Sequence, residues 1–134
     1  MSVMRLACAA AVAALAGLAV SAGFAQSAFP FDRDLVLDAR PMRGSKRVPI
    51  LSIDESGRAQ IDLWCRSGAG QVVVSGATIK ITLGPLREDA CTPERARRDE
   101  EMAAALSEVT RWRTDGDRVV LVGPTELRFL LSAH

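Results

Sequence analysis

Apolar and polar positions alternate over most of the chain after residue 47, and a period of two residues is typical of half-buried β-strands. The clearest case is 77–83 (ATIKITL), in which Ile79, Ile81 and Leu83 alternate with other residues. The strands predicted from alternation or from short apolar runs are 35–37, 50–53, 59–63, 71–74, 77–83, 119–122 and 127–131. The turns predicted between them from glycine, proline and polar residues are 54–57, 67–70, 75–76, 84–85, 114–117 and 123–125.

One segment has helical rather than strand spacing, and it predicts a helix over 93–110. Thr92 suits the N-cap position, and Pro93 suits the first helical position. The apolar stripe of this helix consists of Met102, Ala103, Leu106 and Val109. Arg111 and Arg113 are predicted to lie near its carboxyl end, where positive charge suits the helix dipole. Because no helix separates successive strands, we expect an α+β fold with a mainly antiparallel sheet.

The first 25 residues have the layout of a secretory signal peptide. Arg5 precedes an apolar run over 6–20, and the small residues of 21–25 predict cleavage before Gln26. The run is short for a membrane span of about 20 residues, although a permanent amino-terminal anchor is the alternative. Cys8 stands before the apolar run and not at the cleavage point, so a lipoprotein is not expected. We therefore predict a periplasmic or secreted protein, exported by the Sec route and not stably inserted in a membrane after cleavage.

The predicted division of the chain is a removed signal peptide (1–25), a flexible leading segment (26–33) and one domain (34–134). Removal of the signal peptide takes away Arg5 and leaves 16 basic against 16 acidic residues. A neutral chain offers no basic excess for nucleic acid or an anionic membrane, so neither is predicted as a partner. A basic loop is the candidate surface patch, formed by Arg40, Arg43, Lys46 and Arg47. It could hold an anionic ligand, or it could be a solvated loop beside nearby aspartates.

Cys65 and Cys91 are the two cysteines of the predicted mature chain. An even cysteine count in an exported protein favours a disulfide, and closing this loop would stabilise the fold by roughly 3.5 kcal/mol. Two free buried thiols are an alternative. A redox or metal role is another, because Cys91 lies just before a helix start, where a thiolate is favoured. Metal binding needs further ligands, and the chain has neither a CxxC pair nor a histidine other than His134.

Candidate catalytic groups are sparse. A terminal histidine is hard to hold in place as a general base, which disfavours Ser/His/Asp or Cys/His hydrolysis. The acidic runs 88–89 and 99–101 are expected to be solvated, the second on the polar face of the helix. The glycines of 68–70 lack the Lys-Ser/Thr and helix start of a phosphate loop. Trp64 and Trp112 could line a ligand pocket, but core packing is the favoured interpretation for both. We predict no enzyme activity, cofactor or metal.

The order of landmarks along the chain resembles the META domain, the family of the bacterial heat-shock protein HslJ. The matching segments are the 54–57 turn, Cys65 with Gly70, 77–83, Ala90-Cys91, 102–109 (MAAALSEV), 115–121 (DGDRVVL) and 127–129. Together they cover roughly 34–131. The chain departs from the family pattern around its first cysteine, where Trp64 and Arg66 replace a Gly and an Asn.

The resemblance implies a compact, strongly curved antiparallel sheet, a partial barrel, packed on one helix. It also implies an envelope protein connected with stress or drug tolerance, and it supplies no catalytic residues. We therefore expect a non-enzymatic, monomeric domain that binds an envelope protein or a small ligand. The alternative is a small disulfide-tied inhibitor or binding module, in which the loop 40–47 is presented to a protease or receptor. A thiol-redox enzyme using Cys91 is the third hypothesis.

Overall fold

The computed structural model describes residues 13–14, 17, 28–87 and 90–132. The predicted signal peptide lies outside the described residues apart from three isolated positions. The elements are β1 (Asp34–Leu37), β2 (Ile50–Ile53), β3 (Arg58–Asp62), β4 (Ser67–Ser75), β5 (Thr78–Leu86), α1 (Pro93–Ser107), β6 (Arg111–Asp115), β7 (Arg118–Val122) and β8 (Leu127–Leu131). No helix among the described segments is long and apolar enough to cross a membrane.

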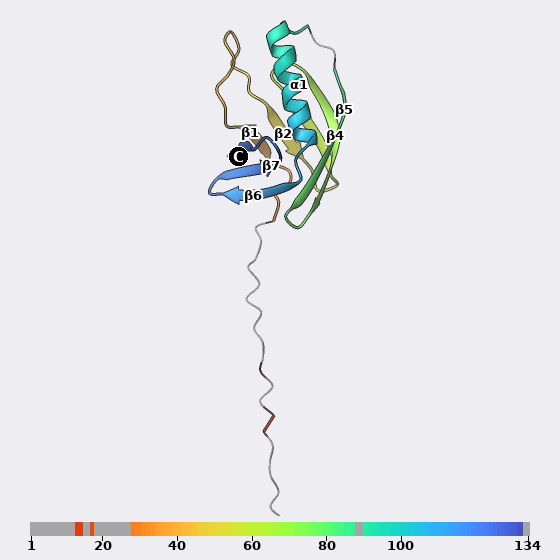
Figure 1. Cartoon of the computed structure of the whole chain (residues 1–134), viewed down its shortest axis with the longest axis vertical. Coiled ribbons are helices and arrows are strands. Elements are labelled where there is room, and N and C mark those ends of the chain that lie inside the picture. Colours follow the sequence, from red (N-terminus) through yellow and green to blue (C-terminus); the bar gives the residue numbers. More distant parts are fainter. Residues whose placement is uncertain (1–12, 15–16, 18–27, 88–89, 133–134) are drawn as a thin grey trace, which may run out of the picture.

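The strands form a closed antiparallel barrel in chain order, and not the partial barrel expected from the sequence. Closure comes from the short β1, which bonds β2 on one edge and β8 on the other. The junction between β5 and β6 is the narrowest, since their register joins only Thr78 and Arg111. Helix α1 contacts β5 and lies along one side of the barrel (Figure 1). The helix therefore covers the side on which the sheet is least continuous.

The predicted turn at 67–70 is wrong, because these residues begin the nine-residue strand β4. The reason is close packing against β5. A Cβ atom at Gly70 would lie 2.7 Å from the carbonyl oxygen of Thr82, and one at Gly68 would lie 3.0 Å from that of Pro85. The register also shifts between the two glycines. Here glycine permits two strands to approach at an irregular pairing, which is one of its recognised uses within sheets.

The predicted turn at 84–85 is also wrong, since β5 continues through both residues to Leu86. Proline has no backbone N–H to donate to a neighbouring strand, so it is tolerated in a strand where no partner requires a donor at that position. In the described structure β6 pairs with β5 only at Thr78, so the far end of that edge has no ladder for Pro85 to interrupt. The β4–β5 hairpin is consequently longer than the apolar pattern predicts.

Helix α1 ends at Ser107, three residues before the predicted end, and Glu108 is its C-cap. The residues placed by sequence near its carboxyl end belong instead to β6, a strand that was not predicted. Trp112 is the only buried residue of β6, while Arg111 and Arg113 are exposed. A strand with one apolar position shows no alternation, which explains why it was missed. Neither arginine sits in the last turn of the helix.

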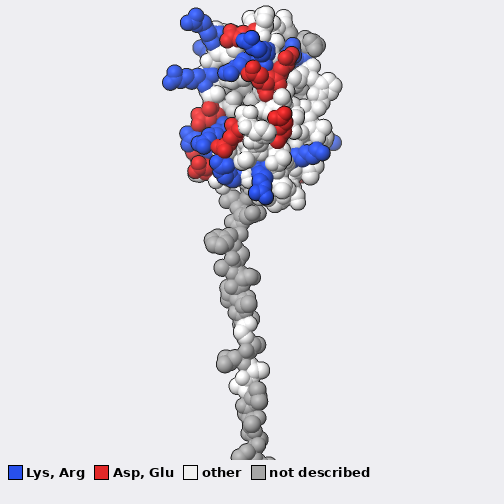
Figure 2. Space-filling view, in the orientation of Figure 1, with Lys and Arg blue, Asp and Glu red and all other residues white. Residues whose placement is uncertain are grey.

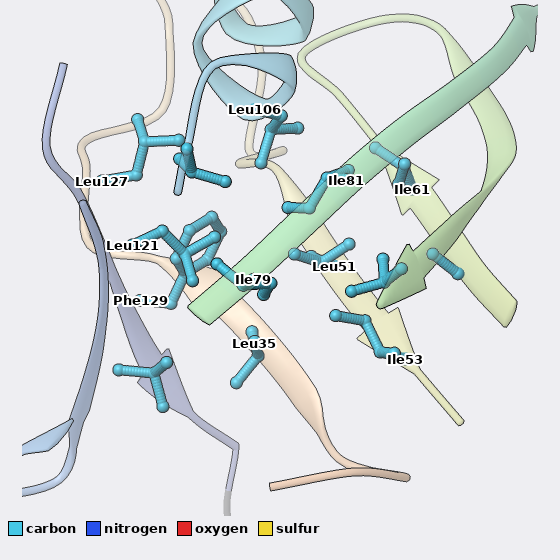
Figure 3. Close-up of a cluster of buried hydrophobic side chains, with 14 of the residues drawn as sticks. Leu35, Leu51, Ile53, Ile61, Ile79, Ile81, Leu106, Leu121, Leu127 and Phe129 are labelled. Atoms are coloured by element: carbon cyan, nitrogen blue, oxygen red, sulfur yellow. The ribbon is translucent and has the colours of Figure 1, made fainter. Parts of the chain in front are cut away.

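The core fills the barrel interior and is completed by α1 (Figure 3). Leu106 of the helix points into the barrel toward Ile81 and Leu121, and each is at most 2% exposed. Burying one such side chain contributes about 1.5–3 kcal/mol. Phe29, within the leading segment predicted to be flexible, is also buried, with its ring 5.1 Å from that of Trp112.

Candidate functional site

Asp99 of α1 is fully buried, although the sequence suggested a solvated acid. Its carboxylate accepts hydrogen bonds from the backbone N–H groups of Trp64 and Arg66, both at 2.7 Å. The N–H of Cys65 also points at the carboxylate, 3.2 Å from Oδ2 and 3.3 Å from Oδ1. One buried side chain thus satisfies three consecutive backbone donors. The polar group is tolerated in the interior because it is fully hydrogen-bonded.

This contact ties the turn after β3 to the helix. The turn closes on itself through a 2.8 Å hydrogen bond from the Leu63 N–H to the Arg66 carbonyl. Cys65 in the same turn lies at bonding distance from Cys91, with the sulfur atoms 2.05 Å apart and the Cα atoms 6.0 Å apart. Cys91 immediately precedes Thr92, whose side chain caps the helix. The turn is therefore joined to α1 at two places, by Asp99 and by the cysteine pair.

The ligand atoms of Cys65, Cys91 and Asp99 lie within 4.8 Å of one another, a spacing that would suit a metal ion. Its chemistry fits poorly. A disulfide presents no thiolate, and metal binding requires deprotonated thiols. The Asp99 carboxylate is also already engaged by backbone donors. With the cysteines bonded, the cluster acts as a structural clasp between the turn and the helix.

The helix also borders a groove of about 490 Å³, which lies between α1 and the neighbouring ends of β1 and β8. Most of the groove's lining is apolar: Leu37, Ala39, Trp64, Met102, Ala104, Ala105 and Leu127. The polar residues in its wall are Arg98, Glu101, Glu108 and Thr125. Ligand pockets in proteins commonly combine such an apolar lining with a few polar groups. This groove is the more apolar of the two cavities that border the helix.

Arg98 stands at one end of this groove and covers the indole of Trp64. The centre of its guanidinium lies 5.5 Å from the ring centroid, a cation–π geometry. Trp64 is 6% exposed and lies outside the main core cluster. Both tryptophans are buried, as the favoured core interpretation predicted, and Trp112 also donates its Nε1–H to the Gly76 carbonyl at 2.7 Å. Trp64 in addition forms part of the groove wall.

A second, more polar cleft adjoins the groove and shares Arg98 and Glu101 with it. Its other lining residues are Arg40, Pro41, Met42, Arg43, Glu94 and Arg97. Figure 2 shows charged side chains gathered over the loop and the helix, whereas the side formed by β4 and β5 is mostly uncharged. The structure therefore brings half of the predicted basic patch, Arg40 and Arg43, next to the helix arginines.

The other half of the predicted patch lies apart from this cleft. Arg47 donates to the carbonyl of Arg66 at 3.3 Å and forms an ion pair with Asp62 at 3.7 Å. Lys46 is exposed and lines neither cavity. The four basic residues of the loop therefore do not form one continuous patch. Arg47 instead helps to hold the loop against the turn after β3.

Sequence reasoning assigned Asp99 to the solvent, and it named Trp64 only as the less favoured pocket-lining alternative. A signal for Asp99 is present, because positions 99, 102 and 106 follow one another at spacings of three and four and so share a helix face. Trp64 carries a weaker signal, since it breaks the alternation of β3 beside a cysteine. The acidic pair Glu88 and Asp89 lies outside the described residues.

Comparison with known proteins identifies the family and the fold. The sequence model of the META domain matches residues 33–133. A DUF4847 family protein from Bacteroides vulgatus is similar in structure, with a TM-score of 0.50 and 15% identity over 61% of this chain. The chain spans 57% of that protein's length. A protein solved by NMR has a TM-score of 0.56 and 17% identity, covering 75% of this chain and 89% of its own. A search of curated proteins found no match.

Proposed function

This chain belongs to the META domain family, and we propose that it is an exported, monomeric binding domain of the bacterial envelope with no enzymatic activity of its own. In this proposal it binds a partner protein or a small ligand and thereby supports tolerance of envelope stress or drugs. The observation that carries the proposal is the apolar groove beside α1, whose wall includes Trp64 and Met102.

The cysteine pair supports the compartment. Disulfides persist in the periplasm and outside the cell, and they are rare in the reducing cytosol of mesophiles. Cys65 and Cys91 lie at bonding distance across the turn–helix junction. A small domain with five aromatic residues after position 25 benefits from such a crosslink, since its core is modest. The signal-peptide layout of residues 1–25 supplies the export route in this proposal.

The position of the basic loop favours binding in the groove over the inhibitor alternative. An inhibitory loop must project freely into a protease cleft. Here the loop is held at its middle by a hydrogen bond from Arg95 to the Arg43 carbonyl, and at its second end by the ion pair of Arg47 with Asp62. Its first half also lines the cleft beside the helix. We therefore assign the loop to the wall of a binding site.

Two measurements test the proposal. Cell fractionation with intact-mass analysis should find an envelope protein that begins at Gln26 and carries no free thiol. A precursor that retains residues 1–25 in the cytosol would contradict export. For binding, a deletion strain under detergent or drug stress should be rescued by the natural chain but not by Ala104→Trp, which fills the groove from an exposed helix position.

The matched control is Ser107→Trp, which is also at an exposed position of the same helix but lines neither cavity. It should rescue growth as well as the natural chain does. Equal rescue by both tryptophan variants would remove the groove from the function. Loss of rescue in both, with normal amounts of folded protein, would do the same, because it would place the functional surface elsewhere on the helix.

A further inference from the structure

We infer that the groove beside α1 binds a small amphipathic anion, with an apolar chain along the groove and an acidic head group at the Arg98 end. This inference rests on the proposed function and names the class of ligand. It follows from three properties of the site. These are the separation of charge along the groove, the surplus of arginines at one end of it, and the scarcity of free backbone hydrogen-bonding groups in its wall.

The first property is a polarity along the helix. Arg98 and Glu108 line the groove, with Met102 and Ala105 between them. Ten residues of α-helix separate the two charges, a rise of about 15 Å. The intervening wall is mostly apolar, apart from Glu101 one helical turn from Arg98, and it suits an extended hydrocarbon chain. A negative head group is attracted to the Arg98 end and repelled by Glu108, so the groove favours one orientation of the ligand.

The second property is the surplus of positive charge at that end. The adjoining cleft contains Arg40, Arg43, Arg97 and Arg98 against Glu94 and Glu101. Within the described part of the chain, none of these four arginines forms an ion pair, although arginines elsewhere on the surface do. Guanidinium groups bind carboxylate and phosphate oxygens through paired, charge-assisted hydrogen bonds. The cleft is therefore complementary to an anionic head group.

The third property separates a small amphiphile from a peptide strand. An extended peptide needs partners for its backbone N–H and C=O groups. The strands that border the groove, β1 and β8, already pair on both edges: β1 with β2 and β8, and β8 with β1 and β7. A hydrocarbon chain has no such requirement. The volume of about 490 Å³ also falls within the range of small-ligand pockets, about 300–1,000 Å³.

The test uses oxidised protein purified from its host and dodecanoate as the probe, below the concentration at which it forms micelles. Isothermal titration should detect saturable binding, and NMR chemical-shift changes should cluster at the groove, including the indole N–H of Trp64. Dodecanol and dodecyltrimethylammonium share the chain but lack the negative charge, so both should bind at least about tenfold more weakly, which corresponds to one strong charge-assisted contact.

Variants locate the site. Arg98→Gln should weaken dodecanoate binding about five- to tenfold. Arg111→Gln removes the same charge at an exposed position of β6 outside both cavities, and it should leave binding unchanged. Ala104→Trp should abolish binding, while Ser107→Trp should not. Because these four substitutions are at exposed positions, loss of folding is not expected to obscure the result.

Three outcomes would overturn the inference: no saturable binding of dodecanoate, equal binding of the cationic or neutral analogues, or equal affinity of the Arg98→Gln and Arg111→Gln proteins. Binding of an acidic amphipathic peptide in place of dodecanoate would also overturn it. Failure here is distinguishable from failure of the proposed function. If dodecanoate does not bind but Ala104→Trp still fails to rescue growth, the groove remains the functional site and only the ligand class is wrong.

Discussion

The buried carboxylate of Asp99 makes a sharp prediction about stability. Replacing Asp99 with alanine removes the acceptor for three successive backbone N–H groups, those of Trp64, Cys65 and Arg66. Alanine offers no replacement acceptor, and within the described segments the N–H of Trp64 bonds only to Asp99. We therefore expect Asp99→Ala to be strongly destabilising, although helix propensity alone would favour alanine at this position.

The magnitude follows from the hydrogen bonds. A buried donor left without a partner costs about 1–3 kcal/mol, and bonds to a charged acceptor lie at the upper end of that range. The two bonds of 2.7 Å should dominate, and the longer bond from Cys65 should add less. Removing the carboxylate also removes the cost of burying its charge. The net expected loss is about 3–5 kcal/mol, a large part of the 5–15 kcal/mol typical of a whole domain.

Urea unfolding followed by circular dichroism measures this loss directly. Glu100→Ala is the matched control, because Glu100 is the exposed neighbour of Asp99 in the same helix, and it should change stability by less than about 0.5 kcal/mol. Asp99→Asn keeps the shape and one acceptor oxygen, so its loss should fall between the two. If the free energy of unfolding of the Asp99→Ala protein lies within about 1 kcal/mol of that of the natural chain, the three hydrogen bonds do not hold the turn and the reasoning fails.

Three further predictions concern other parts of the fold. Replacing Cys65 and Cys91 with serine should lower the free energy of unfolding by about 3.5 kcal/mol relative to the oxidised natural chain, and reduction of the natural chain should cause a similar loss. An unchanged urea midpoint would contradict a structural disulfide. The Ser56 hydroxyl and the Arg58 backbone N–H, which hydrogen-bond to the Asp54 carboxylate, lower its pKa below 3.8, so its stabilisation is present above that pH and is lost as the pH falls through the lowered value. Asp54→Asn should therefore reduce the loss of stability between about pH 5 and pH 3, as measured by urea unfolding at each pH. The same pH dependence in the variant and the natural chain would refute this. Gly70→Ala should destabilise by about 1–3 kcal/mol in urea unfolding, since its Cβ would lie 2.7 Å from a backbone oxygen of β5, and a neutral effect would mean that the strands can separate there.

The elements could be predicted from the sequence wherever the buried residues follow a regular spacing or form a continuous apolar run. Seven of the eight strands and the helix follow from alternation, from short apolar runs or from helical spacing of apolar residues, because each of these patterns marks residues that enter the core. Strand β6 could not be found in this way, since it buries only Trp112. The extensions of β4 and β5 through glycine and proline depend on how closely the two strands approach and on which edge is unpaired. Those are tertiary properties, and local turn preference pointed the other way.

The candidate site was less predictable because it depends on contacts between distant segments. The cysteine pair could be proposed from the compartment and the even count. Asp99 was assigned to the solvent because two further acids follow it, yet its spacing from Met102 and Leu106 places it on the buried face. The basic loop was recognised, but the sequence could not tell that Arg40 and Arg43 face the helix while Arg47 turns toward Asp62.

The clasp and the groove depend on each other through the turn after β3. Asp99 fixes the backbone of Trp64, and the indole of Trp64 then forms part of the groove wall beneath Arg98. Both Asp99 and Arg98 belong to α1, so the helix positions the wall from its buried face and supplies the charge from its exposed one. A binding wall built on a loop alone would lose more conformational entropy when it is ordered by a ligand. Here the hydrogen bonds and the cysteine pair order the turn before any ligand arrives. In the proposed function the buried acid and the crosslink therefore contribute to binding as well as to stability, although neither Asp99 nor the cysteines line the groove.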